Sequence, residues 1–247
     1  MKRTLIKVLT VVLGVVACIC MLTTSIIASQ NGNNLGIAPI QSHPQGKSYG
    51  EWAKAFWKWR LETPYDINPA VNNNPCGGGQ TGNVWFLTSD AFVDYTTPPG
   101  VQEFRTCTIP ADTSLFFPLI NNAYAAFLTD PPAERTYDFV RKVTRCAGPV
   151  DISVKIDGER VDKPYQYYEE SPFFTIHLPS NSIYKDFYPA MTWEPVADTG
   201  YYLFLRPLPV GKHKIEWTAE WHNCGYGQYV TPAMYFIMNY EITVKPH

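Results

Sequence analysis

The runs Asn83-Val-Trp-Phe-Leu87, Arg105-Thr-Cys-Thr-Ile109, Pro110-Ala-Asp-Thr113 and Ser114-Leu-Phe-Phe-Pro-Leu119 decide the fold of this chain. Three of them are rich in β-branched and aromatic residues, and Gly, Pro and Asp separate them. Such a succession is typical of consecutive strands in an antiparallel sheet. We place the core within residues 83–121 and predict an all-β fold with minor α. The predicted architecture is an antiparallel β-sandwich with two packing helices, and a jelly roll is the candidate topology.

The N-terminus has the pattern of an export signal. A cationic head at residues 2–7 precedes an apolar run over residues 8–28, which ends in small residues. This pattern predicts that residues 1–29 are a Sec-type signal peptide and that the protein is secreted or extracytoplasmic. Two alternatives stay open. The run is about the 20 residues needed to remain as a membrane anchor, and the segment ending at Cys18 is similar to a lipobox.

Charge and length restrict the class of protein. Removing residues 1–29 takes away three of the 20 basic residues and no acid, so 17 basic residues face 22 acidic ones and the net charge becomes −5. An acidic chain without a basic run argues against a nucleic-acid partner. The sequence predicts membrane contact only through an uncleaved N-terminal segment. The remaining length suits one large all-β domain over residues 48–247, preceded by a flexible leader over residues 30–47.

Four cysteines follow the N-terminal segment. An even number in an exported chain predicts two disulfides, for which three connectivities are open. We favour Cys76 with Cys107, because this bond would clamp the strand at residues 83–87 against its neighbour, and Cys146 with Cys224. A metal site is the weaker interpretation, because only His222 lies near a cysteine in the required spacing. The sequence therefore predicts no metal and no cofactor.

Two helices are predicted. Ser48 and Glu51 form a capping box, and a stripe follows at Trp52, Ala55, Phe56 and Trp59 up to the stop at Thr63-Pro64. Trp57 lies off this stripe, where it would mark either a binding surface or a second packing contact. The second helix is predicted from an N-cap at Asp130, with Pro131 at its first position, to about Arg145. We expect its arginines and its lysine, Arg135, Arg141, Lys142 and Arg145, to face solvent.

Short-range residue patterns predict the loops, a hairpin turn and the faces of the later strands. Residues 66–80 are rich in Asn, Gly and Pro, and we favour a structural loop pinned by a disulfide over a calcium loop. Asp157-Gly158 predicts a two-residue hairpin turn, and residues 179–199 read as a long irregular excursion. In residues 212–221 the alternation places His213, Ile215, Trp217, Ala219 and Trp221 on one buried face.

Several motifs of this chain, taken together, are similar to those of a known group of proteins. A Trp-rich helix, Val84-Trp-Phe-Leu87, Arg105-Thr-Cys107-Thr-Ile-Pro-Ala111, Leu115-Phe-Phe-Pro118, Ile156-Asp-Gly158, Ser171-Pro-Phe173 and Pro209-Val-Gly-Lys-His213 together resemble a group of secreted microbial proteins of unknown function. Where that group has Gly-Lys after the Pro-Ala corner, this chain has Asp112-Thr113. The resemblance implies a secreted β-sandwich and supplies no activity or catalytic residue.

Our first functional hypothesis is a non-catalytic surface or ligand-binding domain. Aromatic rings offer flat apolar faces on which sugar rings stack, so an extracellular glycan or a cell-surface component is the predicted partner. The predicted ligand-binding residues lie in loops: Tyr184, Tyr188, Trp193 and Tyr226. The competing interpretation is that each of these rings packs at the rim of the core.

The alternative hypothesis is a secreted carbohydrate-active hydrolase or lyase that uses paired carboxylates. The candidate pairs are Glu169 or Glu170 with Glu194, and Glu216 with Glu220. Glu216 and Glu220 would lie ~13 Å apart along one strand, which makes them a poor pair. The sequence assigns no catalytic residue, and we interpret His177 and His213 as structural because both lie in strand patterns.

Overall fold

The computed structural model describes residues 35–71, 74–146 and 148–246. The predicted signal peptide or anchor, including Cys18, lies outside these residues. None of the helices in the described ranges is long and apolar enough to cross a membrane.

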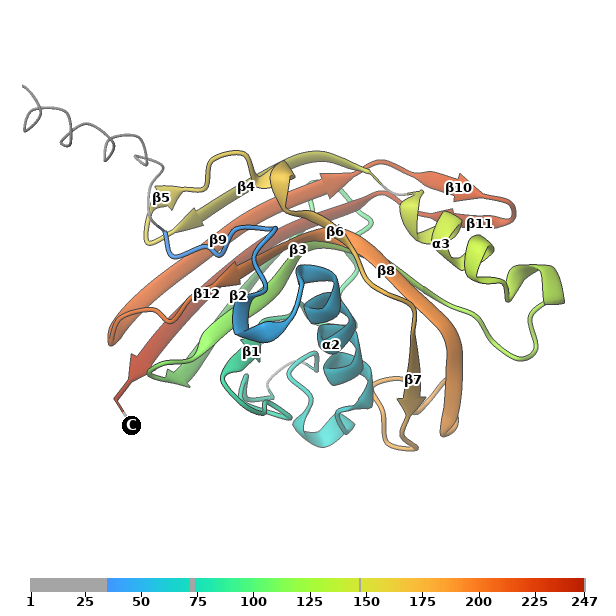
Figure 1. The fold of residues 1–247 in the computed structure, drawn as a ribbon, viewed down its shortest axis with the longest axis horizontal. Helices are drawn as coiled ribbons and strands as arrows, with labels where there is room; N and C mark the ends of the chain where they lie inside the picture. The colour runs from blue at the N-terminus through green and yellow to red at the C-terminus, as the bar shows by residue number, and fades with distance from the viewer. Residues whose placement is uncertain (1–34, 72–73, 147, 247) are drawn as a thin grey trace, which may run out of the picture. The chain divides into compact units, whose positions relative to one another are not determined.

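One of the two main sheets, sheet A, contains five strands within the described residues. Four of them lie in the order β1-β3-β8-β6, and β7 also pairs with β8 (Figure 1). The β1–β3 pair is parallel and the other pairs are antiparallel. The strands are β1 Val84–Phe86, β3 Ser114–Ala125, β6 Tyr168–Glu170, β7 Phe174–Leu178 and β8 Met191–Leu205.

The second main sheet, sheet B, has the order β2-β12-β9-β4-β5, and its β2–β12 pair is parallel. The all-β class with minor α is confirmed, but these parallel pairs make both sheets mixed, unlike an all-antiparallel sandwich or jelly roll. The strands are β2 Val101–Pro110, β4 Pro149–Ile156, β5 Glu159–Arg160, β9 Gly211–Trp221 and β12 Met234–Lys245. A separate hairpin joins β10 Cys224–Tyr226 to β11 Tyr229–Thr231.

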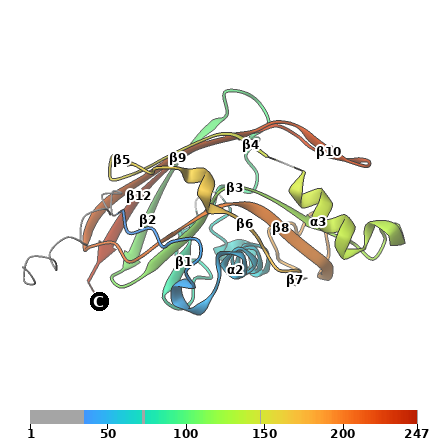
Figure 2. The same ribbon diagram turned by 45° about the horizontal axis from the view of Figure 1, so that its top comes forward.

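Sheet A lies between sheet B and helix α2, Tyr49–Glu62 (Figure 2). Successive residues of β3 face opposite layers: the ring of Phe116 contacts Tyr49 and Trp52 of α2, and the ring of Phe117 contacts Trp217 of β9. Both faces of β3 are therefore buried. This explains its unbroken apolar run, because alternation is needed only where one face of a strand is wet.

Helix α2 begins and ends where the sequence predicted. The Ser48 hydroxyl accepts from the Glu51 amide, and the Glu51 carboxylate accepts from the Ser48 amide. A flexible leader was predicted over residues 30–47. In its described part, residues 35–47, the segment instead packs on the domain. Ile37 forms a β-bridge with Leu205, Ala38 is buried, and a 3₁₀ turn follows at Pro44–Gly46. The Tyr49 hydroxyl donates to the Ala38 carbonyl, so contacts with distant residues hold a segment whose own sequence is loop-like.

The second helix starts later than predicted. Helix α3 is Tyr137–Arg145 with Thr136 as its N-cap, and only a 3₁₀ turn, Pro132–Glu134, forms at the predicted start. Pro132 disfavours helical geometry in Pro131, so the predicted start does not continue into an α-helix. Arg141 is also not solvated as expected. Its guanidinium is mostly buried and donates to the backbone carbonyls of Asp198 and Ser171.

The predicted excursion over residues 179–199 was wrong for its second half, because Met191–Thr199 belongs to β8. Pro195, within this strand, lies where the β7–β8 register shifts between Phe174 and Ile176. A bulge tolerates proline because no ladder donor is required there. Two further 3₁₀ turns are Tyr65–Ile67 and Pro164–Tyr167.

Both favoured disulfide pairings are confirmed. Cys76 is bonded to Cys107, and Cys146 is bonded to Cys224, with Cα atoms 5.5 Å apart in each pair. The predicted hairpin turn is also present, with Asp157 and Gly158 both at positive φ between β4 and β5.

Candidate functional site: a cavity beside helix α2

A cavity of about 210 Å³ lies where α2, β3, β9, β12 and the loop over residues 88–95 meet. This volume is below the roughly 300–1,000 Å³ of sites for drug-sized ligands, so it suits a small molecule. Most of its wall is apolar. The apolar and aromatic side chains include Phe56, Trp57, Ala91, Val93, Leu119, Ile120, Trp217, Met234, Phe236 and Met238. The polar wall residues are Arg60, Thr88, Ser89, Asp90 and Asn121.

Arg60 is the cationic residue of this wall. It follows Trp52 and Phe56 at i+8 and i+4, so the helix directs it inward, and it is 8% exposed. Its Nη1 donates to the Thr88 hydroxyl and, over 2.8 Å, to the Ser89 carbonyl. Burial lowers the pKa of the Arg60 guanidinium. Among the described residues no carboxylate lies within 4.0 Å of it, although a buried cation is normally paired.

The nearby acid Glu103 is already engaged. It accepts from the Asp90 amide at 3.1 Å, from the Tyr95 hydroxyl and from Arg105 at 3.3 Å. Burial raises the pKa of the Glu103 carboxyl. These bonds fix the 88–95 loop and hold Glu103 outside ion-pairing distance of Arg60, although the charges of Glu103 and Asp90 still act on the Arg60 guanidinium and raise its pKa against the effect of burial.

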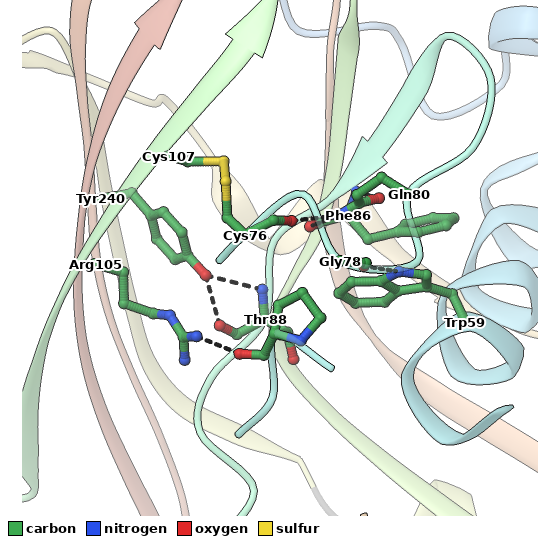
Figure 3. Close-up of a disulfide and its surroundings, with 10 residues drawn as sticks. Trp59, Cys76, Gly78, Gln80, Phe86, Thr88, Arg105, Cys107 and Tyr240 are labelled. Atoms are coloured by element: carbon green, nitrogen blue, oxygen red, sulfur yellow. Dashed lines mark hydrogen bonds between the residues drawn. A yellow bond between two sulfur atoms is a disulfide. The ribbon is translucent and has the colours of Figure 1, made fainter. Parts of the chain in front are cut away.

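The start of the same loop is fixed from sheet B. The Tyr240 hydroxyl donates to the Thr88 carbonyl at 2.6 Å and accepts from the Thr88 amide at 3.1 Å (Figure 3). Arg105 donates to the carbonyl of Pro69, so the loop over residues 66–80 is tied to β2 as well. The wall that presents Thr88 and Ser89 to Arg60 is therefore preorganised.

Asn121, at another part of the wall, is held by a buried carboxyl. Its Nδ2 donates to Asp198 Oδ1 at 3.2 Å, and the Tyr202 hydroxyl donates to Asp198 Oδ2. Asp198 is fully buried, and burial raises the pKa of its carboxyl to about 7. The indole N–H of Trp57 lies close enough to Asp198 to lower this pKa, although it forms no hydrogen bond of ordinary geometry among the described residues.

Three of the four predicted ligand-binding residues lie together. The rings of Tyr184, Tyr188 and Trp193 contact one another at centroid distances of 5.5–6.3 Å, and Phe127 joins them. They do not form the expected open platform, because Trp193 is only 5% exposed. Long-range pairing of β8 with β7 buries it. Trp57, Ala91 and Tyr184 pack on the same buried cluster, so this aromatic group adjoins the cavity wall.

Tyr226 is not part of this group. It lies on β10, where its ring contacts Phe139 at 5.4 Å. No contact joins it to the other three predicted residues among the described interactions.

Three members of the predicted carboxylate pairs, Glu169, Glu170 and Glu216, are engaged in other contacts. Glu170 accepts two hydrogen bonds from Arg145, at 2.6 and 2.7 Å, and these bonds lower the pKa of the carboxyl. Glu169 accepts from the Glu170 amide, and Glu216 is paired with Lys214 at 2.8 Å. Glu194 is exposed on β8. Within the described ranges no three His, Cys, Asp or Glu residues gather to hold a metal ion.

Sequence reasoning missed Arg60 and Asp198. The sequence did contain a signal for Arg60. It lies eight positions after Trp52 and four after Phe56, so it shares the inward-facing side of the helix with them. Asp198 was hidden because residues 191–199 were interpreted as loop. Trp57 lies off the apolar stripe of the helix, as the sequence indicated, and in the structure it lines the cavity.

Together the fold and this cavity define a disulfide-stabilised, predominantly β domain with a small, partly open site of mixed polar and apolar lining. No family model and no curated protein matches the chain. Among solved structures, the chain is similar to the cysteine protease inhibitor EhICP2 from Entamoeba histolytica, at 10% sequence identity. That match covers 57% of this chain and 86% of the inhibitor with a TM-score of 0.18. A likeness at this level carries no argument about the fold or the function.

Proposed function

We propose that this chain is an exported, non-catalytic binding protein whose ligand is a small organic acid with an apolar body. The observation that carries the proposal is Arg60, a buried guanidinium in an apolar cavity with no acid within ion-pairing distance among the described residues. A ligand carboxylate would supply the missing charge, and hydrogen bonds to charged groups are the stronger ones. Two disulfides support export, because they persist in oxidising compartments.

The other polar wall residues restrict the ligand further. Asp90 lines the same cavity, and its Oδ1 accepts from the Phe92 amide at 2.8 Å. Its second oxygen is left to accept from a ligand donor. The ligand therefore carries a hydroxyl or amino group beside its acid, as an aromatic hydroxy acid or amino acid does. The resemblance to secreted microbial proteins of unknown function agrees with export and remains part of the proposal.

Calorimetric titration with four matched probes tests this function. 3-Phenyllactate and phenylalanine carry the acid, the donor and the ring. 3-Phenylpropanoate lacks the donor, and 3-phenylpropanamide lacks the charge. We expect binding of the first two, weaker binding of the third and none of the amide. Arg60→Gln should reduce affinity about 10- to 100-fold, the worth of a hydrogen bond to a charged group. Arg206→Gln removes an exposed arginine and should change nothing.

A second variant keeps the test decisive if Arg60→Gln folds poorly. Val93→Phe fills the cavity from the 88–95 loop without removing a charge. It should abolish binding while circular dichroism stays native. Equal binding of acid and amide, unchanged affinity in both variants, or no binding of any probe would each overturn the proposal.

Glycan recognition is the second candidate, and two exposed rings favour it. Phe187 is 72% exposed and Tyr188 is 37% exposed in the loop between β7 and β8. Exposed aromatic faces are surfaces on which sugar rings stack. Retention on immobilised polysaccharide that is lost in Tyr188→Ala supports this candidate. Retention unchanged by that substitution removes it.

A further inference from the structure

Strand β2 is the long outer strand of sheet B. It has 10 residues and pairs with β12 on one side only. The Glu103 carbonyl accepts from Asn239 Nδ2 of β12, and the Ala111 amide donates to the Lys245 carbonyl, so the odd-numbered residues of β2 bond β12. Backbone groups alternate in direction along a strand. Four residues of β2 therefore direct their N–H and C=O groups away from the sheet: Gln102, Phe104, Thr106 and Thr108.

The other described outer strands of the two main sheets are short or capped. Strands β1, β5 and β6 have 3, 2 and 3 residues. On β7 the Lys58 ammonium donates to the Thr175 carbonyl, and the Glu62 carboxylate accepts from the His177 amide. Among the described residues, none outside β12 bonds the backbone of β2. An edge strand of this length with free backbone groups is a template for pairing with another chain.

This edge is rigid and carries an exposed ring. Cys107 is bonded to Cys76, and Arg105 donates to the Pro69 carbonyl, so loop contacts hold β2 through its inward side chains and do not use its outward backbone groups (Figure 3). A rigid edge loses little conformational freedom when a second strand joins it. Phe104, on the outer face, is 75% exposed. Covering such a ring favours association, because burial of apolar surface is its main driving force.

The charges of β2 select the partner strand. Glu103 and Arg105 flank Phe104 and point inward, and inward charges at an edge oppose pairing with arbitrary strands. Because the outward groups alternate, the two-fold axis between two antiparallel copies of β2 must pass through a residue. An axis through Glu103 or Arg105 sets like charges opposite each other, and an axis through Gln102 or Thr106 leaves both charges opposite uncharged residues. An axis through Phe104 sets Glu103 opposite Arg105 of the second copy and brings the two Phe104 rings together, and such cross-strand pairs are stabilising.

We propose that two copies of this chain pair antiparallel through β2, about an axis at Phe104, which joins their B sheets into one continuous sheet. Gln102 then bonds Thr106 of the second copy, so the outward residues near the axis all face one another. A peptide of another protein is the competing occupant, because extended peptides add strands to free edges. Such a peptide would need a cation opposite Glu103 and an anion opposite Arg105, and β2 itself carries both in that order.

Sedimentation velocity of the secreted protein over a range of concentrations tests this pairing, and we expect a reversible dimer. Thr106→Pro removes one outward N–H from each copy and should stay folded by circular dichroism, because proline is tolerated at a sheet edge. It should raise the Kd of the dimer about 10- to 100-fold, because symmetry removes two hydrogen bonds. Phe104→Lys should raise the Kd about 10-fold or more, because it sets two lysines opposite each other. The matched control, Phe187→Lys, changes a ring that is 72% exposed elsewhere and should dimerise as the parent does.

Two synthetic peptides distinguish a second copy from strands in general. The peptide of residues 100–108 should dissociate the dimer by occupying the edge of β2. A peptide of the same composition, with the residues at positions 103 and 105 exchanged, sets like charges opposite each other and should compete about 10-fold less well.

Three outcomes overturn the proposal. A parent that stays monomeric at every concentration removes the interface. A dimer that neither Thr106→Pro nor Phe104→Lys weakens has its contact elsewhere on the molecule. Equal competition by the two peptides assigns the edge to extended peptides in general, because the charges of β2 then select nothing.

Discussion

Strands β3 and β9 carry their hydrophobic residues in opposite ways. In β3 every residue from Ser114 to Phe117 is buried, because α2 covers one face and sheet B covers the other. In β9 the residues Ile215, Trp217 and Ala219 are buried, and the residues between them reach solvent. The comparison shows that polar groups in the part of sheet A that is covered on both faces must find partners inside the protein, whereas those on the outer face of sheet B can use water.

The largest expected difference between the two strands is in packing. Phe116 is fully buried and its ring contacts Tyr49, Trp52, Phe86, Tyr202 and Phe204. Phe116→Ala should reduce the free energy of unfolding by about 3–5 kcal/mol. Thr218→Ala on the wet face of β9 should cost at most about 1 kcal/mol. Urea unfolding of both variants measures this, and equal losses would contradict the burial of β3 on both of its faces.

The next difference concerns a charge inside sheet A. The pKa of Asp198 is raised by burial to about 7 from its ordinary value of 3.8. The folded protein holds this proton more tightly than the unfolded chain, so Asp198 stabilises below pH 3.8 and loses that contribution as pH rises to about 7. Three pKa units correspond to about 4 kcal/mol. Asp198→Asn cannot titrate, and its stability should fall much less over this range.

Unfolding by urea at intervals from pH 4 to pH 8 gives the measurement. The parent should lose several kcal/mol relative to Asp198→Asn across the series. Asp186→Asn, which changes an exposed carboxylate, is the matched control and should follow the parent. Parallel curves for the parent and Asp198→Asn would show that the buried carboxyl is ionised throughout.

The same comparison explains what could be predicted from sequence. The faces of β9, the Ser48 cap and the Asp157-Gly158 turn depend on residues close in the chain, so local patterns predict them. The first half of β8 could not be recognised, because Pro195 is tolerated only through a bulge against β7. Likewise the hydrogen-bond partners that hold Arg60 at the cavity, Thr88 and Ser89, lie about 30 residues away in the sequence. Candidate site residues that are defined by long-range contacts are therefore hard to predict from local sequence patterns.

The smallest expected effect is near the start of β9 in sheet B, where His213 titrates near the surface. Its Nδ1 lies 2.7 Å from Asp157 Oδ2, and its Nε2 lies 2.8 Å from the Pro209 carbonyl oxygen. Both partners are acceptors, so both ring nitrogens carry protons and the ring is an imidazolium. Burial by itself lowers the pKa of His213, but the bonds to Asp157 and Pro209 outweigh it and the pKa is raised.

The sign of this effect matches that of Asp198, but its pH window is higher. The folded protein binds the proton of His213 more tightly, so the stabilisation is complete below about pH 6.5 and is lost as pH rises through the higher folded pKa. A partly exposed pair contributes under about 1 kcal/mol. In an Asp198→Asn background, adding His213→Gln should flatten the stability curve above pH 6.5 and leave the curve between pH 4 and pH 6 parallel to that of the single variant. An imidazole pKa at or below 6.5 by NMR titration would contradict the doubly protonated ring, and with it the idea that His213 keeps its charge through a partly exposed pair while the buried Asp198 is neutralised by binding a proton.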